Sequence, residues 1–234
     1  MNTIVDTLLL DSKDRESFSS GTTDFTIKFP RPIQDVSHYR FTKVIIPLSM
    51  DNVTSSNNTY EINDVSFSVS TGYYTIPSLI DQLNDDHSAA YSFDWTANGR
   101  IRMVSDTATN FKFEPLETAK LLGFTSSSYS GDIAYVAEHL PILQSTNYFT
   151  LHVEEIANRQ KHSIYHSDYR SNILDLIPNT GSHGDVLVYE PTNQIYKYVQ
   201  DSKITGLHIS LRNSANEIVD LQSNNIQIVI ERHK

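Results

Sequence analysis

The sequence predicts an all-β fold, a single jelly-roll β-sandwich with a helix–hairpin–helix insertion. Apolar and polar residues alternate with period two in several separate segments, as in half-buried strands. One segment, at about 72–124, breaks this alternation. Its removal leaves about 180 of the 234 residues, a length that suits an antiparallel sandwich such as the eight-stranded jelly roll. We therefore expect residues 1–234 to form one domain with an insertion at about 72–124.

The strand candidates follow one another along the whole chain. A first strand is expected at 4–10, and residues 44–46 are apolar on both faces, which indicates a central strand. Pro47 can follow only where its missing N–H is not needed. Regular alternation predicts further strands at 25–29, 65–69, 149–153, 207–211 and 226–230. Short strands are also expected at 132–137, 186–189 and 195–199.

The expected insertion begins with a helix. Thr75 can cap it and Pro77 suits its first turn. Leu79, Ile80 and Leu83 then lie on one helical face. A second short helix is expected at 115–122, where Gly123 can adopt the left-handed conformation that ends a helix and Phe124 can fold back on it.

A hairpin joins the two helices, and its register follows from the side chains. A two-residue Asn98-Gly99 turn would place Ile101 opposite Thr96. A three-residue loop, 97–99, with Gly99 left-handed, instead pairs Trp95 with Ile101, Phe93 with Met103, and Asp94 with Arg102. Because register decides which side chains share a face, we prefer the three-residue loop.

Composition excludes several classes of function. The net charge is −10, whereas nucleic-acid binders usually carry a basic excess, so we expect no direct contact with nucleic acid. The chain has no cysteine, which fits a reducing compartment. No stretch approaches the roughly 20 apolar residues that span a membrane. The first residues also lack the basic start and cleavage site of a signal peptide.

Histidine pairs do not indicate a metal site. His162 and His166 are four residues apart, but the tyrosines around them indicate an extended segment instead of a helix. His208 alternates with apolar neighbours, so we expect its ring to face solvent or a partner. His139 and His152 have no neighbours of the kind that bind metals.

Carboxylate pairs and nucleophile motifs likewise give little indication of an active site. Glu154 and Glu155 are adjacent on an expected strand, so their side chains should point to opposite faces. Asp85 and Asp86 stand at the end of the first helix, where solvated charge is the simpler interpretation. The sequence has no GxSxG motif and no phosphate-binding loop, since the pair Gly181 and Gly184 lacks a following lysine and helix. We expect no catalytic, cofactor-binding or metal-binding residues, and no cofactor.

Aromatic residues gather in the segment 165–198. Tyrosine suits protein interfaces and also ordinary sheet packing, and both interpretations stay open here. The tyrosines concerned are Tyr165, Tyr169, Tyr189, Tyr196 and Tyr198.

The order of several short motifs resembles a known group of proteins. The chain opens with TLLLDSKDR, then DFTIKFPRPI, then a strand that ends in IIP. It continues with GYYTIPSLIDQLN and an ending of the form AxxLGF at 119–124, and it closes with ITGLHISLRN and NIQIVIE. In this order the sequence resembles the penton (vertex) and small capsid proteins of the double-jelly-roll virus lineage, found in virophages, polinton-like elements and some large DNA viruses.

The resemblance implies a structural virion protein without catalytic residues. It implies a homopentamer that caps the five-fold vertices of an icosahedral capsid and contacts the major capsid protein. Such a protein is made in the host cytoplasm and ends in the virion capsid. The alternative is a spike or fibre-like jelly-roll module whose loops bind a receptor or glycan. A third possibility, a carbohydrate hydrolase, would need two carboxylates facing each other across a cleft.

Overall fold

The computed structural model divides the chain into two compact units. It describes residues 5–34, 36–85, 91–113, 116–143, 146–157, 165–166, 169–170, 173–192, 196–198 and 203–233. The first unit comprises Met1–Met50 and Thr146–Lys234, and we call it the jelly-roll unit. The second, Asp51–Ser145, is continuous in sequence and interrupts the first, and we call it the inserted unit.

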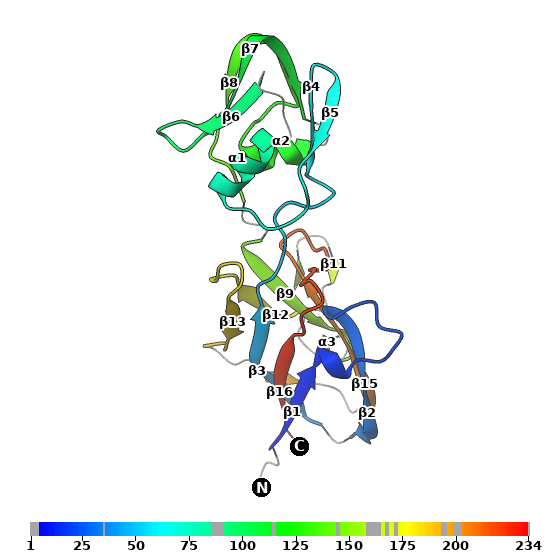
Figure 1. Ribbon diagram of the computed structural model, residues 1–234. Coiled ribbons are helices and arrows are strands. Elements are labelled where there is room, and N and C mark those ends of the chain that lie inside the picture. Colours follow the sequence, from blue (N-terminus) through cyan, green and yellow to red (C-terminus); the bar gives the residue numbers. More distant parts are fainter. Residues whose placement is uncertain are drawn as a thin grey trace. The chain divides into compact units, whose positions relative to one another are not determined.

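The jelly-roll unit consists mainly of antiparallel strands (Figure 1). Its elements are β1 (Val5–Asp11), η1 (Ser12–Asp14), β2 (Asp24–Ile33), β3 (His38–Pro47), β9 (Tyr148–Val153), α3 (Glu154–Ala157), β10 (Tyr165–His166), β11 (Tyr169–Arg170), β12 (Ile173–Pro178), β13 (Val186–Tyr189), β14 (Tyr196–Tyr198), β15 (Ile204–Arg212) and β16 (Gln227–His233).

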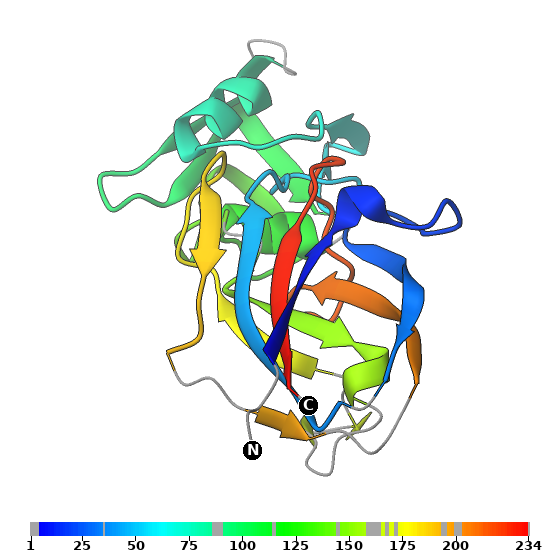
Figure 2. The same ribbon diagram turned by 90° about the horizontal axis from the view of Figure 1, so that it is seen from below.

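Eight of these strands form two sheets in jelly-roll order. Sheet 1 has the order β1-β16-β3-β13, with β14 also paired to β3, and Figure 2 looks onto it. Sheet 2 has the order β12-β9-β15-β2. Among these eight strands the first pairs with the last, and the second pairs with the seventh, as in a jelly roll. The predicted all-β jelly-roll sandwich is therefore confirmed, and β3 is a central strand as expected.

One apolar core lies between the two sheets. Sheet 1 contributes inward residues such as Val44 and Ile228, and sheet 2 contributes residues such as Leu151 and Ile209, all of them fully buried. The alternate residues of each strand face away from this core, which is the pattern that the period-two alternation predicts.

The inserted unit has its own sheet and its own core. Its elements are β4 (Thr59–Ile62), β5 (Val65–Ser68), α1 (Ile76–Asp85), β6 (Tyr91–Trp95), β7 (Ile101–Lys112), α2 (Leu116–Leu122) and β8 (Ser128–Val136). The long strand β7 pairs with β6 and β4 along one edge and with β8 along the other. In its core the ring of Tyr60 packs edge to face with those of Phe93 and Phe111.

This unit is larger than the insertion expected at about 72–124. The reason is pairing between strands that are distant in sequence: β4 and β8 lie outside the expected bounds, yet both bond to β7. Within the unit, the side chains of α1 that are buried include Leu79, Ile80 and Leu83, as predicted.

The register predicted for the hairpin is confirmed. Trp95 pairs with Ile101 and Asp94 with Arg102, and Nε and Nη2 of Arg102 donate to the Asp94 carboxylate at 2.8 and 2.5 Å. Gly99 has a φ of 76°, the left-handed conformation that the three-residue loop requires.

Gly123 ends α2 in the left-handed conformation, with a φ of 88°. The N–H of Phe124 donates to the carbonyl of Ala119 at 2.8 Å, and its ring is buried, so it folds back on the helix as expected. The N–H of His139 donates to the Gly123 carbonyl at 2.9 Å. This close approach leaves no space for a side chain, because a Cβ at position 123 would lie 2.4 Å from the His139 oxygen.

Gly123→Ala should therefore destabilise the inserted unit by about 2–4 kcal/mol, through left-handed strain and backbone overlap together. Gly131→Ala is the matched control, since Gly131 has a φ of 86° and open space around its Cβ position. We expect that control to cost only about 1 kcal/mol. Denaturant unfolding followed by fluorescence of Trp95, the single tryptophan, measures both. Equal losses in the two variants would contradict the role assigned to the His139 contact.

Candidate functional site

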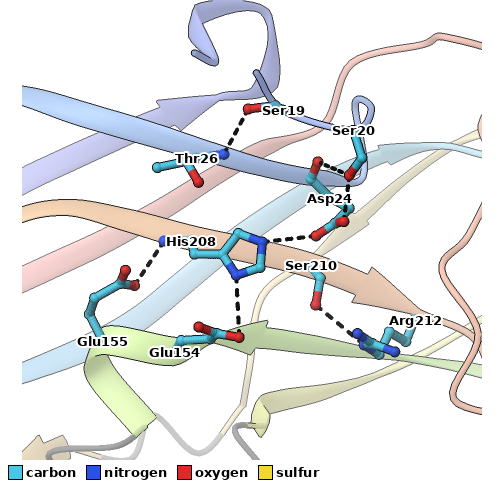
Figure 3. Close-up of polar contacts among 9 residues, drawn as sticks. All are labelled: Ser19, Ser20, Asp24, Thr26, Glu154, Glu155, His208, Ser210 and Arg212. Atoms are coloured by element: carbon cyan, nitrogen blue, oxygen red, sulfur yellow. Dashed lines mark hydrogen bonds and ion pairs between the residues drawn. The ribbon is translucent and has the colours of Figure 1, made fainter. Parts of the chain in front are cut away.

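A histidine lies between two carboxylates on the outward side of sheet 2 (Figure 3). Nε2 of His208, on β15, is 2.9 Å from Oδ1 of Asp24, and Nδ1 is 3.3 Å from Oε1 of Glu154. The backbone N–H of His208 donates to Oε2 of Glu155 at 2.8 Å. We call these four residues the His208 cluster. It connects β2, β15 and the start of α3.

The chain path explains why both glutamates reach the same strand. Our expectation that Glu154 and Glu155 point to opposite faces of a strand is wrong, because β9 ends at Val153 and α3 begins at Glu154. Ile156 is fully buried, which fixes the short helix against the core. Successive helical residues are about 100° apart, so neighbouring side chains can both face β15.

The order of contacts shows what the cluster can do chemically. Ser20 donates a hydrogen bond from Oγ to Oδ2 of Asp24 at 2.5 Å, so the sequence of contacts is serine, aspartate, histidine. A catalytic triad needs the imidazole against the serine hydroxyl, where it can accept the proton. Here both ring nitrogens of His208 face carboxylates. The cluster therefore joins three elements and does not activate a nucleophile.

Further polar side chains extend along the same face. Thr150 and Ser210 are buried despite their polar groups. Oγ1 of Thr150 lies 3.0 Å from Nε2 of His152, and Nε of Arg212 donates to Oγ of Ser210 at 3.4 Å. Burial, with the nearby Arg212 guanidinium adding to it, lowers the pKa of His152 from 6.5 to about 4. The ring of His152 is therefore neutral at neutral pH.

Two open surface pockets adjoin the His208 cluster. The larger, of about 590 Å³, is lined by Arg15, the segment 20–24 and the loop around Asp220. The smaller, of about 230 Å³, is lined by Thr26, Glu155 and residues of the segment 203–206. Asp24 lines the larger pocket, yet none of its lining residues is aromatic, so it has no platform on which a sugar ring could stack.

The remaining residues considered from the sequence are spread over the chain. Asp85 is the last residue of α1, and His139 is exposed in the loop after β8. Gly181 and Gly184 lie in the loop between β12 and β13, and Tyr189 packs on Phe41 with ring centroids 6.3 Å apart. Those that lie outside the described residues, or whose side chains do, are Asp86, His162, Tyr165, His166, Tyr169, Tyr196 and Tyr198.

The described residues offer no metal site and no membrane-spanning helix. They contain no group of three or more histidine, aspartate or glutamate side chains arranged to hold a metal ion. Among the helices in the same part of the chain, none is long and apolar enough to cross a membrane.

Comparison with known proteins places the fold. No family model matches the sequence, and no curated protein matches it either. The structure is similar to the crystal structure of the mavirus penton protein, with a TM-score of 0.55 and 10% sequence identity over 99% of both chains. It is also similar to a chain in the cryo-EM structure of the Sputnik virophage, with a TM-score of 0.51 and 11% identity over 100% of this chain and 98% of the other. The resemblance drawn from the sequence motifs is thus confirmed at the level of the fold.

The low pKa of His152 leads to an expected pH dependence of stability. Since the folded pKa is below the unfolded one, the unfolded chain takes up the proton first, and stability should fall as pH decreases from about 6.5 to about 4. The loss should stay below about 3 kcal/mol, because the ring is only partly buried. His152→Gln removes this titration and should flatten the decline in denaturant midpoint over that range.

His183→Gln is the control for that experiment, since His183 is exposed on a loop of the same unit. The denaturant midpoint of this control should decrease with falling pH as it does in the parent chain. If the denaturant midpoint of His152→Gln falls with pH as steeply as that of the parent chain and of this control, the assigned burial of His152 is wrong.

A double-mutant cycle tests the connection through His208. Asp24→Ala and His208→Ala should show a coupling energy of about 0.5–1 kcal/mol, as expected for a partly exposed pair. Glu190 pairs with Lys43 on sheet 1, so Glu190→Ala combined with His208→Ala should be additive. Unfolding followed by circular dichroism gives the four free energies. A coupling energy no larger than that of the Glu190 control would contradict the interaction between Asp24 and His208.

Proposed function

We propose that this chain is a structural subunit of a virus particle, and that five copies form the penton at each five-fold vertex of an icosahedral capsid. The observation that carries the proposal is the extent of the structural likeness. It covers 99% of this chain and 99% of the mavirus penton protein, and so takes in the inserted unit as well as the jelly roll. A likeness restricted to the sandwich would support only a common scaffold.

The chemistry of the described residues supports a structural role. Both ring nitrogens of His208 are engaged by carboxylates, and the ring of His152 is neutral and partly buried. These contacts stabilise the outward face of sheet 2, and His208 has no ring nitrogen directed at a serine hydroxyl. We accordingly propose that the protein is not an enzyme and uses no cofactor.

The proposed partners are further copies of this chain and the major capsid protein. The net charge of −10 opposes direct contact with nucleic acid. We propose that residues 1–234 act as one jelly-roll domain carrying the inserted unit, that the chain is made in the host cytoplasm, and that it ends in the virion capsid.

The purified protein should sediment as a closed ring of five 26.6-kDa chains, at about 133 kDa, and not as an open series of larger species. Analytical ultracentrifugation over a range of concentrations gives the mass. Negative-stain images should show five-fold rings. A monomer at all concentrations, together with absence of the chain from purified particles, would overturn the proposal.

A further inference from the structure

The two outward faces of the sandwich differ in chemistry. The face of sheet 2 carries the polar contacts of His208, Ser210 and His152, and one exposed large apolar side chain, Leu176, occurs among its described strands. The face of sheet 1 carries four: Val5 (47% exposed), Leu9 (66%), Val186 (60%) and Val188 (52%). An antiparallel sheet that faces water normally shows polar residues on that side.

Exposed and half-exposed apolar side chains form an oblique band on the outward side of sheet 1. Leu9 on β1 is paired with Val229 on β16, and Val188 on β13 is paired with Ile45 on β3. Val229 is paired with Lys43, and Gln227 is paired with Ile45, so Val229 and Ile45 are diagonal neighbours. The band therefore runs obliquely across the four strands, with Lys43 and Gln227 on either side of it. We call Leu9, Val229, Ile45, Val188 and Val186 the sheet 1 band. An apolar surface that spans a whole sheet indicates a protein interface.

The edge of the sheet beside this band is open. Within the described part of the chain, β1 pairs with β16 alone, and its register runs without a shift from Val5 to Asp11. The segment VDTLLLD contains no proline and no lysine. By contrast, the edge strand β2 of sheet 2 contains Lys28, Pro30 and Pro32, which protect a strand from unwanted pairing. β1 carries Asp6 and Asp11 but lacks the lysine and the prolines of β2, so it is the less protected of these two edges.

The charges around the band indicate what covers it. Nζ of Lys43 is 2.9 Å from Oε1 of Glu190, and Arg40 pairs with Glu231, so the ionic groups beside the band neutralise one another. A strongly charged partner would gain nothing there. Twelve of the 28 acidic residues and four of the 18 basic residues lie in 51–145, which leaves the jelly-roll unit with 16 against 14 and a charge of only −2. Jelly-roll units of different copies therefore repel one another little.

We propose that the sheet 1 band is the surface through which one copy of this chain packs against a second copy. The inference rests on the proposed pentamer and specifies which face forms its contacts. In a closed ring the interface is heterologous, so the band of each copy meets a different surface of the next. The core of such an interface is poor in charge and rich in apolar contact, as the band is.

The test replaces exposed residues, which limits damage to the fold. Leu9→Glu combined with Val188→Glu places two charges in the band. The matched control is Val65→Glu combined with Ile133→Glu, two aliphatic residues on strands of the inserted unit that are 56% and 53% exposed. Analytical ultracentrifugation measures mass, while circular dichroism and thermal melting measure folding. We expect the band variant to sediment as a folded monomer and the control to keep the mass of the parent chain.

A second measurement keeps the test decisive if the charged variant unfolds. The chain has no cysteine, so Val188→Cys and Val65→Cys each introduce a single thiol. In the assembled protein the thiol at position 188 should react with a maleimide at least about tenfold more slowly than the thiol at 65, and equally fast after dilution to monomers.

The outcomes separate the two proposals. A folded band variant that keeps the parent mass, or equal labelling of both thiols in the assembled protein, would overturn the assignment of this face and leave the pentamer intact. A parent chain that is monomeric at every concentration would overturn the pentamer and this interface together.

Discussion

The jelly roll depends on one long-range constraint, the pairing of the first strand with the last. β16 lies between β1 and β3 in sheet 1, with Leu10 opposite Ile228 and Ile228 opposite Val44. All three side chains are buried in the core. Without β16, β1 loses its one partner among the described strands, and the core loses the middle of one wall. The contacts of His208 on sheet 2 also depend on it, because the pairing of β1 with β16 completes the sandwich that holds sheet 2 in place.

Local patterns in the sequence predicted most of the strands and one register, because alternation and turn chemistry act over a few residues. The pairing of Trp95 with Ile101 followed from which side chains must share a face. Two features depended on tertiary contacts and could not be predicted. Burial of Ile156 turns the chain into a helix at Glu154, which brings that carboxylate to His208. Asp24, the other carboxylate, is 184 residues from His208, a separation that no local pattern can bridge.

The extent of the inserted unit also depends on contacts between strands that are distant in sequence. The strand β8 resembles any half-exposed strand in sequence, and only its pairing with β7 assigns it to this unit. What distinguishes the two outward faces of the sandwich is likewise tertiary. Leu9 and Val188 are far apart in the chain, and the sheet joins them into one band. The sandwich thus has one polar face with internal hydrogen bonds and one face on which apolar residues are exposed.

The continuity of the inserted unit also affects how the chain is made. All strands that pair with β7 lie within residues 51–145, so its core is complete once that segment has left the ribosome. The surrounding sandwich cannot close before residues 227–233 are synthesised, because they form β16. Until then the edges of β1 and β3 that pair with β16 stay unpaired, since contacts between distant segments form late. The middle of the polypeptide can thus mature before its two ends meet.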